Sequence, residues 1–266
     1  MTRFALDHMT IIDTSPAQLA LAARAAGCDG MCLFMEPMHV LPLMPKFDIY
    51  SDRAARAEAR RVMEDQGVTL DLAYPFTLTR RTDVASFATA MDCAAELGAG
   101  MINALLYDRD PARRLDTCGR FCDMAHRFGL RVGVEFYPPS QVRSLAAALE
   151  LVVQIARPGQ VGINVDLLHL MRSHGSIAEL ASVPEGYVLY GQVADGPAHA
   201  PDNAELEASC ERLLCGEGDF DVAGFVHALP AGCPVSVEIP RNHAVGSETV
   251  AMRARRAVES VRATIG

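Results

Sequence analysis

The chain of 266 residues is long enough for one large domain, and half of its residues are hydrophobic, which excludes a disordered protein. Its formal net charge of −9 disfavours a general nucleic-acid-binding protein, which would present a basic face. No apolar run reaches the roughly 18 residues of a membrane helix, and the start, MTRFALDHMTIID, lacks the apolar core of a signal peptide. We therefore expect a cytoplasmic protein with no membrane segment and no nucleic-acid partner.

Strand-like and helix-like segments alternate through the first half. Apolar, often β-branched runs predict strands at 4–9, 30–35, 68–73 and 101–106. Helices are expected from Ser15-Pro16, a cap followed by proline at the first helical position, to near Gly27. Further helices are expected at 51–66, from Asp83 to about 97, and at 111–128. The loop EPMHVLPLMPKFDIY after the second strand is longer than usual connections, and we expect it to cover a site.

The second half continues the same rhythm. Strands are predicted at 131–136, 161–166, 187–193 and 235–239, with helices at 142–156, 176–181 and 220–229 and from Ser247 onward. The stretch 195–218 is predicted to be irregular. Eight βα units of about 30 residues predict an α/β protein with a single (β/α)8 TIM barrel over 1–266. A doubly wound open sheet is the alternative, but no GxGxxG follows the first strand.

The cysteines are typical of small buried apolar residues in a reducing compartment. They form no CxxC pair and stand mostly among alanines and leucines: Cys28, Cys32, Cys93, Cys118, Cys122, Cys210, Cys215 and Cys233. A disulfide framework or a zinc cluster is the alternative.

Four polar side chains close four successive apolar strands. They are Glu135 in VGVEF, Asp166 in VGINVD, Gln192 in YVLYGQV and Glu238 in VSVEI. Because the loops after barrel strands build the active sites of such folds, these residues should converge at one half of the barrel mouth. Three carboxylates packed together repel one another, and a hard cation with oxygen ligands removes that repulsion. The pattern predicts a divalent-metal site that suits Mn or Mg better than Zn; unrelated residues that cap helices or pair with arginines are the alternative.

Five motifs carry a family resemblance: VEF, NVDLLHLMRS, GQVADGP, RLLCGEGDFD and VEIPR. In this order they resemble the xylose-isomerase-like TIM barrel superfamily, in particular its sugar phosphate isomerase/epimerase group. The resemblance implies that the four strand-end residues bind one divalent cation and that the two glutamates act in proton transfer. It also implies a homo-oligomer. Histidine is the usual third ligand there, so Gln192 is a departure, and it resembles the 3-dehydroshikimate dehydratase branch.

The expected chemistry is proton abstraction next to a carbonyl through a metal-bound enediolate. We expect an isomerase or epimerase that acts on a small polyhydroxylated carbonyl compound, a sugar or sugar phosphate. Expulsion of a β-hydroxyl from the same site would instead make the protein a dehydroshikimate-type lyase. A non-catalytic barrel that binds sugar acids is the third alternative.

Further candidates surround this predicted site. Glu135, Glu238 and His169 are the expected catalytic residues. Substrate contacts are expected from Arg212, Arg241, Asp195 and Lys46, with surface pairing or loop support as their alternatives. His8 and Glu36, at the ends of the first two strands, are weaker candidates that could equally fill the core or cap a loop.

Overall fold

Eight parallel strands form a closed barrel in the computed structural model, which describes residues 3–266. Met1 and Thr2, the first residues of the start segment considered above, lie outside the described residues. Each strand pairs with the next, and β8 pairs with β1 to close the sheet. The strands are β1 (Phe4–Asp7), β2 (Gly30–Phe34), β3 (Thr69–Leu78), β4 (Met101–Leu106), β5 (Arg131–Glu135), β6 (Val161–Asp166), β7 (Val188–Val193) and β8 (Val235–Val237). The predicted (β/α)8 barrel is confirmed.

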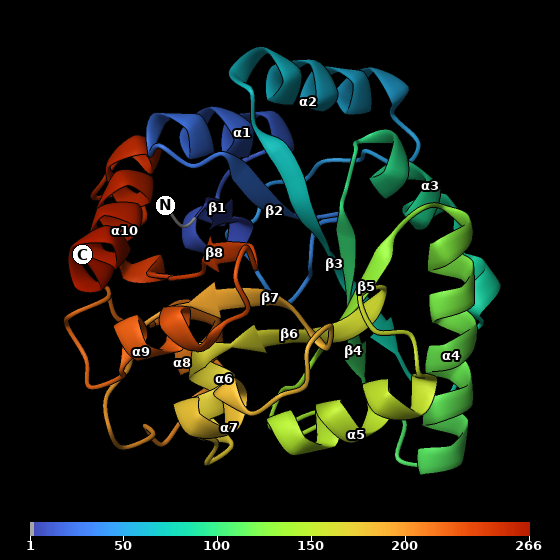
Figure 1. The fold of residues 1–266 in the computed structure, drawn as a ribbon. Coiled ribbons are helices and arrows are strands. Elements are labelled where there is room, and N and C mark those ends of the chain that lie inside the picture. Colours follow the sequence, from blue (N-terminus) through green and yellow to red (C-terminus); the bar gives the residue numbers. More distant parts are fainter. Residues whose placement is uncertain (1–2) are drawn as a thin grey trace.

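Helices surround the barrel, and α10 lies beside α1 near both ends of the chain (Figure 1). The α-helices are α1 (Pro16–Ala25), α2 (Arg53–Gln66), α3 (Ala88–Glu96), α4 (Pro111–Arg127), α5 (Leu145–Ile155), α6 (Leu167–Arg172), α7 (Ile177–Ala181), α8 (Ala204–Cys210), α9 (Val222–Ala228) and α10 (Val250–Ile265). Short 3-10 turns are η1 (His8–Ile11), η2 (Val84–Phe87) and η3 (Asn242–Ala244). None of the helices within residues 3–266 combines the length and the apolar character that crossing a membrane requires.

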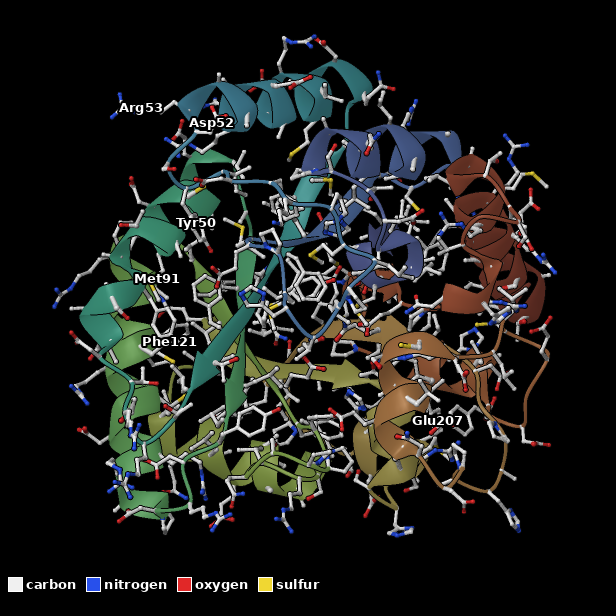
Figure 2. The ribbon with its side chains drawn as sticks, turned by 180° about the vertical axis from the view of Figure 1, so that it is seen from behind. Tyr50, Asp52, Arg53, Met91, Phe121 and Glu207 are labelled. Carbon is white, nitrogen blue, oxygen red and sulfur yellow. The ribbon has the colours of Figure 1, made fainter. Side chains whose placement is uncertain are left out.

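Local capping signals place the helix ends. Ser15 forms a capping box at the start of α1, with Pro16 at the first helical position, as predicted. The Asp52 carboxylate accepts the backbone N–H groups of Ala54 and Ala55 where α2 begins, beside Arg53 (Figure 2). Gly67 ends α2 in the left-handed conformation, which glycine adopts without steric cost. These helix boundaries are therefore readable from short sequence signals.

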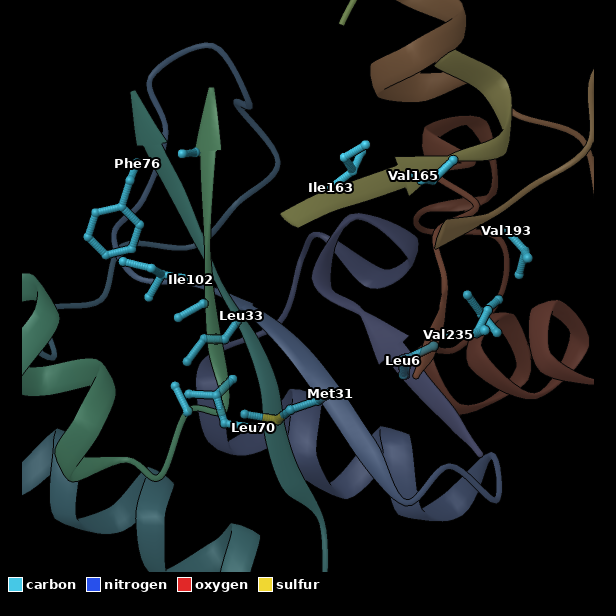
Figure 3. Close-up of a cluster of buried hydrophobic side chains, with 14 of the residues drawn as sticks. Leu6, Met31, Leu33, Leu70, Phe76, Ile102, Ile163, Val165, Val193 and Val235 are labelled. Carbon is cyan, nitrogen blue, oxygen red and sulfur yellow. The ribbon is translucent and has the colours of Figure 1, made fainter. Parts of the chain in front are cut away.

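Strand alternation separates the outer core from the barrel interior. Leu6, Ile163, Val165, Val193 and Val235 belong to the buried cluster between the strands and the helices (Figure 3). Their neighbours along each strand point to the opposite face, because successive side chains alternate across a strand. A second cluster, which includes Ala5, Cys32, Leu72 and Tyr190, fills the barrel interior. The same alternation turns the polar strand-end residues inward.

The structure departs from the predicted elements in four places. β1 ends at Asp7 instead of 9, because His8–Ile11 form the 3-10 turn η1 that the Asp7 side chain caps. β3 continues to Leu78 instead of ending near 73. The stretch predicted to be irregular contains α8, which Asn203 caps and which Glu207 anchors through two hydrogen bonds from Arg172 (Figure 2). α6 follows β6 directly, because Asp166 ends the strand and also accepts the backbone N–H of His169 as a helix cap. Because Asp166 belongs to both β6 and the start of α6, no loop residues stand between the two elements to mark the boundary in the sequence.

The cysteines are unbonded, as expected. Within the described residues all eight are free, and Cys210 and Cys233 are the two that are not fully buried. Burial raises the pKa of Cys28 and Cys215 to about 12, so these thiols stay protonated near neutral pH. They behave as small core residues.

Candidate functional site

The strand-end residues meet at the carboxyl end of the barrel. Asp166 pairs with Gln192 across β6 and β7, and Glu135 pairs with Asn164 across β5 and β6. Glu238 follows β8, and its backbone N–H donates to Val193 of β7. The sequence-predicted convergence of these side chains on one half of the mouth therefore has a direct basis in strand register.

Glu135 is held from two sides. Its Oε1 lies 3.3 Å from Nε2 of His169, and its Oε2 accepts a hydrogen bond from the side-chain amide of Asn103 on β4. The His169 ring also packs against Tyr137, with ring centroids 4.8 Å apart. These contacts fix the direction in which the Glu135 carboxylate faces the cavity.

Arg212 bridges two carboxylates in the centre of the site. Its guanidinium is 2% exposed and lies 2.6 Å from Asp166 Oδ2 and 2.9 Å from Glu238 Oε1. Its Nε donates to the backbone carbonyl of Ala208, at 3.0 Å. The predicted substrate contact Arg212 thus belongs to the carboxylate cluster itself, where it neutralises part of the buried negative charge.

Side-chain amides link the remaining members. Gln192 donates through Nε2 to Glu238 Oε2 and, at 3.5 Å, to Asp7 Oδ2. Asn164 donates to Gln192 Oε1 at 2.5 Å and lies 3.5 Å from Asn103 Oδ1. A continuous row of amides therefore joins the Glu135 side of the mouth to the Glu238 side.

Burial and charge shift the acidities of the cluster. Burial raises the pKa of Glu238 well above its ordinary value, although Arg212 opposes this, and it raises the pKa of Asp7 to about 6. Burial acts in the same direction on Asp166, but the charges of Arg212 and His169 outweigh it and hold the pKa of Asp166 below 3.8. The buried carboxyl groups thus differ in how readily each holds a proton.

The donor set fits a divalent cation. One ligand atom each from Glu135, Asp166 and His169 lies within 4.8 Å of the others. Opposite ligands of one ion lie about 4–5 Å apart, because metal–oxygen distances are about 2.0–2.6 Å. The buried Asn164 Oδ1 has no hydrogen-bond partner among the described residues. If the side-chain amides of Asn164 and Gln192 were both rotated by 180°, Asn164 Oδ1 would accept a hydrogen bond from Gln192 Nε2. The Gln192 side-chain oxygen would then face Glu238, and a bound cation would favour that arrangement.

A cavity of about 190 Å³ opens above this cluster. Its polar lining includes Glu135, His169, Gln192, Arg212 and Glu238. The opposite wall is apolar and comprises Met9, Phe34, Met38, Val40, Leu41, Tyr74, Pro75 and Leu105. Met38, Val40 and Leu41 come from the long loop after β2, so this loop covers part of the candidate cavity.

Other predicted contacts lie elsewhere. The Asp195 carboxylate accepts the backbone N–H groups of Gly196, Gly216, Gly218 and Phe220, and so it holds the loop before α9. Arg241 pairs with Glu217 at 2.8 Å, and Lys46 is exposed. None of the three is among the residues that line the cavity.

The two weaker candidates also stay out of the cavity lining. His8 is buried, and its Nε2 lies 2.9 Å from the carbonyl oxygen of Thr14, while Glu36 is exposed.

Sequence reasoning missed three residues of the site. Asp7 ends β1 and accepts a hydrogen bond from the Tyr74 hydroxyl, while Asn103 and Asn164 hold Glu135 and Gln192. Asp7 was detectable as the acidic end of the first strand. Asn103 and Asn164 lie inside buried strands, where a polar residue needs a partner. That signal was present, but their partners lie on other strands and are not identifiable locally.

The chain matches a known family along most of its length. The family model described as "Xylose isomerase-like TIM barrel" matches residues 20–263. A 3-dehydroshikimate dehydratase from Pseudomonas aeruginosa is 27% identical over 249 residues, which cover 87% of this chain and 37% of that protein. The chain therefore spans little more than a third of the length of this curated relative.

Solved structures share the fold at low identity. A xylose isomerase-like TIM barrel/4-hydroxyphenylpyruvate dioxygenase fusion protein superposes with a TM-score of 0.79 at 21% identity, over 97% of this chain and 42% of that one. The IolI protein with a bound zinc atom gives 0.78 at 17% identity, over 99% and 98% of the two chains. D-psicose 3-epimerase in the presence of D-fructose gives 0.74 at 13% identity, over all of both chains.

Proposed function

Because the chain belongs to the xylose isomerase-like TIM barrel family, we propose that it is a divalent-metal-dependent isomerase or epimerase. Its substrate is a small polyhydroxylated carbonyl compound, and the reaction begins with removal of the proton next to the carbonyl. One observation carries the proposal. Glu135 ends β5 and Glu238 follows β8, and both line the same cavity. His169 contacts both Glu135 and Asp166, and Arg212 links Asp166 to Glu238.

The proposed metal ligands are Glu135, Asp166, Gln192 and Glu238. Of these, Glu135 and Asp166 form with His169 the group of close ligand atoms, so His169 is close enough to contribute or to orient. Mn²⁺ and Mg²⁺ suit a shell made mostly of oxygen atoms. When bound, the cation would polarise the substrate's carbonyl oxygen and make the neighbouring C–H more acidic.

The chain's own residues supply the proton transfers. Glu135 and Glu238 are the two carboxylates that line the cavity, so one takes the proton and the other returns it. Arg212 keeps Asp166 ionised and holds one oxygen of Glu238, which leaves the other in contact with Gln192. His169 lines the cavity and orients the Glu135 carboxylate, because its Nε2 lies 3.3 Å from Glu135 Oε1.

A dehydroshikimate-type lyase is the second candidate. The 27% identity to a 3-dehydroshikimate dehydratase favours it, as does glutamine in place of the usual histidine at position 192. A lyase would expel a β-hydroxyl after the same proton removal, and its product would gain ultraviolet absorbance from a conjugated double bond.

The test is solvent deuterium exchange measured by mass spectrometry. Purified protein with Mn²⁺ or Mg²⁺ is incubated in D₂O with ketoses, inososes and 3-dehydroshikimate, and carbon-bound deuterium is expected in at least one of them. Removal of the metal by a chelator should abolish exchange, re-addition should restore it, and Glu238→Gln should lose it. Undiminished exchange in chelated, metal-free protein would overturn the metal-dependent mechanism, and absorbance gain without an isomeric product would select the lyase.

A further inference from the structure

The cavity offers no free cation to a substrate. Among residues 3–266, the side chains that line it and can carry positive charge are Arg212 and His169. Arg212 uses its guanidinium for Asp166, for both the side chain and the backbone carbonyl of Glu238, and for the Ala208 carbonyl. His169 has Nε2 beside Glu135. Both groups are therefore already committed to carboxylates.

Negative charge exceeds positive charge around the cavity. Glu135 and Glu238 line it, and the buried Asp7 and Asp166 lie directly behind Gln192 and Arg212. Four carboxylates thus face one guanidinium, and with histidine counted as neutral a doubly charged cation would still leave the formal sum negative. An added phosphate or carboxylate would be repelled at close range, where the surrounding protein screens charges poorly.

The wall opposite the carboxylates is suited to carbon, not to charge. Met9, Phe34, Leu41 and Leu105 form much of it, and the ring of Phe34 lies against Tyr74, with centroids 4.4 Å apart. An anionic group placed against these side chains would lose its hydration without gaining a partner. The C–H face of a polyol would instead bury apolar area there.

We propose that the substrate is uncharged: a polyhydroxylated ketone or aldehyde that carries neither a phosphate nor a carboxylate. The inference rests on the proposed function for the chemistry and on the cavity lining for the charge. It excludes sugar phosphates and 3-dehydroshikimate, which is a carboxylate, as the physiological substrates.

One arginine-rich surface could hold an anion outside the cavity. Arg80, Arg81 and Arg109 are exposed, follow β3 and β4, and have no ion pair among the described residues. They line a separate hollow with Tyr107 and Arg113, and none of them lines the catalytic cavity. A substrate with an anionic tail would have to reach this hollow, so the experiment includes it.

The experiment compares matched neutral and anionic ligands. Ketohexoses are paired with their 6-phosphates, and inososes with 3-dehydroshikimate, each at equal concentration with Mn²⁺-loaded protein. Deuterium incorporation gives turnover, and thermal shift gives binding independently of turnover. We expect exchange and stabilisation with a neutral compound, and at least about tenfold lower kcat/KM with its anionic partner, which corresponds to about 1.4 kcal/mol.

Two variants locate the effect. Leu105→Lys places a cation in the apolar wall and should shift the preference towards the phosphorylated ligand, measured as the ratio of kcat/KM or of stabilisation. Arg81→Ala, in the outer hollow, should leave that ratio unchanged. A preference for the phosphate that Arg81→Ala removes would overturn the proposal and assign the anion to the hollow.

The outcomes separate the two proposals. Faster exchange with 3-dehydroshikimate or a sugar phosphate overturns the uncharged substrate and leaves the proton-transfer function standing. Absence of exchange with every compound overturns the function, and the thermal shifts still decide the charge: stabilisation by neutral ligands alone supports the inference, and stabilisation by anions alone refutes it.

Discussion

The two halves of the barrel mouth are chemically different. The ends of β5–β8 present Glu135, Gln192 and Glu238, with Arg212 among them, whereas the ends of β1–β4 present Phe34, Tyr74 and other mainly apolar side chains. Both halves are built from parallel strands, so the difference resides in the side chains and in the long loop after β2. In the proposed mechanism, one half supplies the carboxylates for proton transfer, and the other supplies a wall against the carbon skeleton of the substrate.

Even the histidines at the mouth follow this division. His169 in the polar half touches Glu135, whereas His8 in the apolar half is buried against backbone, with Nε2 near the Thr14 carbonyl and Nδ1 accepting from the Phe34 N–H at 3.4 Å. That pair of contacts requires a neutral ring with its proton on Nε2. The four predictions below test the division, from the largest expected effect to the smallest.

Glu135→Gln should lower turnover by about 10²–10⁴-fold, because an amide cannot accept the substrate proton. The rate of deuterium exchange at saturating substrate measures this. Glu217→Gln is the matched control, since Glu217 pairs with Arg241 outside the cavity. Equal losses in both variants would show that the polar half has no special role.

Arg212→Met should destabilise the protein by about 3–5 kcal/mol, because it leaves Asp166 and Glu238 buried without their counter-charge. Urea denaturation with and without Mn²⁺ measures this. Added Mn²⁺ should restore part of the loss. Arg253→Met is the control, because Arg253 is also buried but, among residues 3–266, pairs only with Asp13, and Mn²⁺ should not rescue it. A rescue of both variants would contradict the placement of the cation.

Acidification should charge His8 at the expense of stability. Burial lowers the pKa of His8 to about 4 in the folded chain, against 6.5 for a free side chain, so the unfolded state binds more protons between these values. The stability that a neutral His8 provides is complete above pH 6.5 and is lost as the pH falls towards 4. Relative to His8→Gln, the wild type should lose about 3 kcal/mol more between pH 7.5 and pH 4.

The comparison with His8→Gln separates the effect of His8 on stability from that of Asp7, which changes in the opposite direction as the pH falls. The raised pKa of Asp7, about 6, means that the folded state binds the extra proton, so Asp7 favours folding as the pH falls. Asp7 is present in both proteins, and its effect cancels in the comparison. Parallel stability curves for the two proteins would refute a neutral buried His8.

Leu41→Ala should raise KM by about fivefold and leave kcat unchanged, because the apolar wall binds substrate and transition state alike. Steady-state kinetics on a responsive neutral substrate measures both constants. Leu21→Ala, on the exposed face of α1, is the control. A fall in kcat with KM unchanged would place part of the chemistry in the apolar half.

The sequence by itself determined the barrel and the direction of the polar strand ends. β-branched runs, capping residues and the repeat of βα units are local signals, and alternation along a strand then turns Asp166 and Gln192 inward together. The long loop after β2 was also recognisable by its length and prolines. These features depend on residues that are close together in the chain, so they can be predicted from the sequence alone.

Tertiary structure alone decided how the inward-facing residues pair. Arg212 reaches Asp166 and Glu238 from a segment that sequence reasoning left irregular. Asp7 meets Gln192 only because the barrel closes, which leaves β8 alone between β1 and β7. Asn103 and Asn164 likewise find their partners on other strands. Such pairings depend on barrel closure and side-chain packing, which are properties of distant residues and have no periodicity in the sequence.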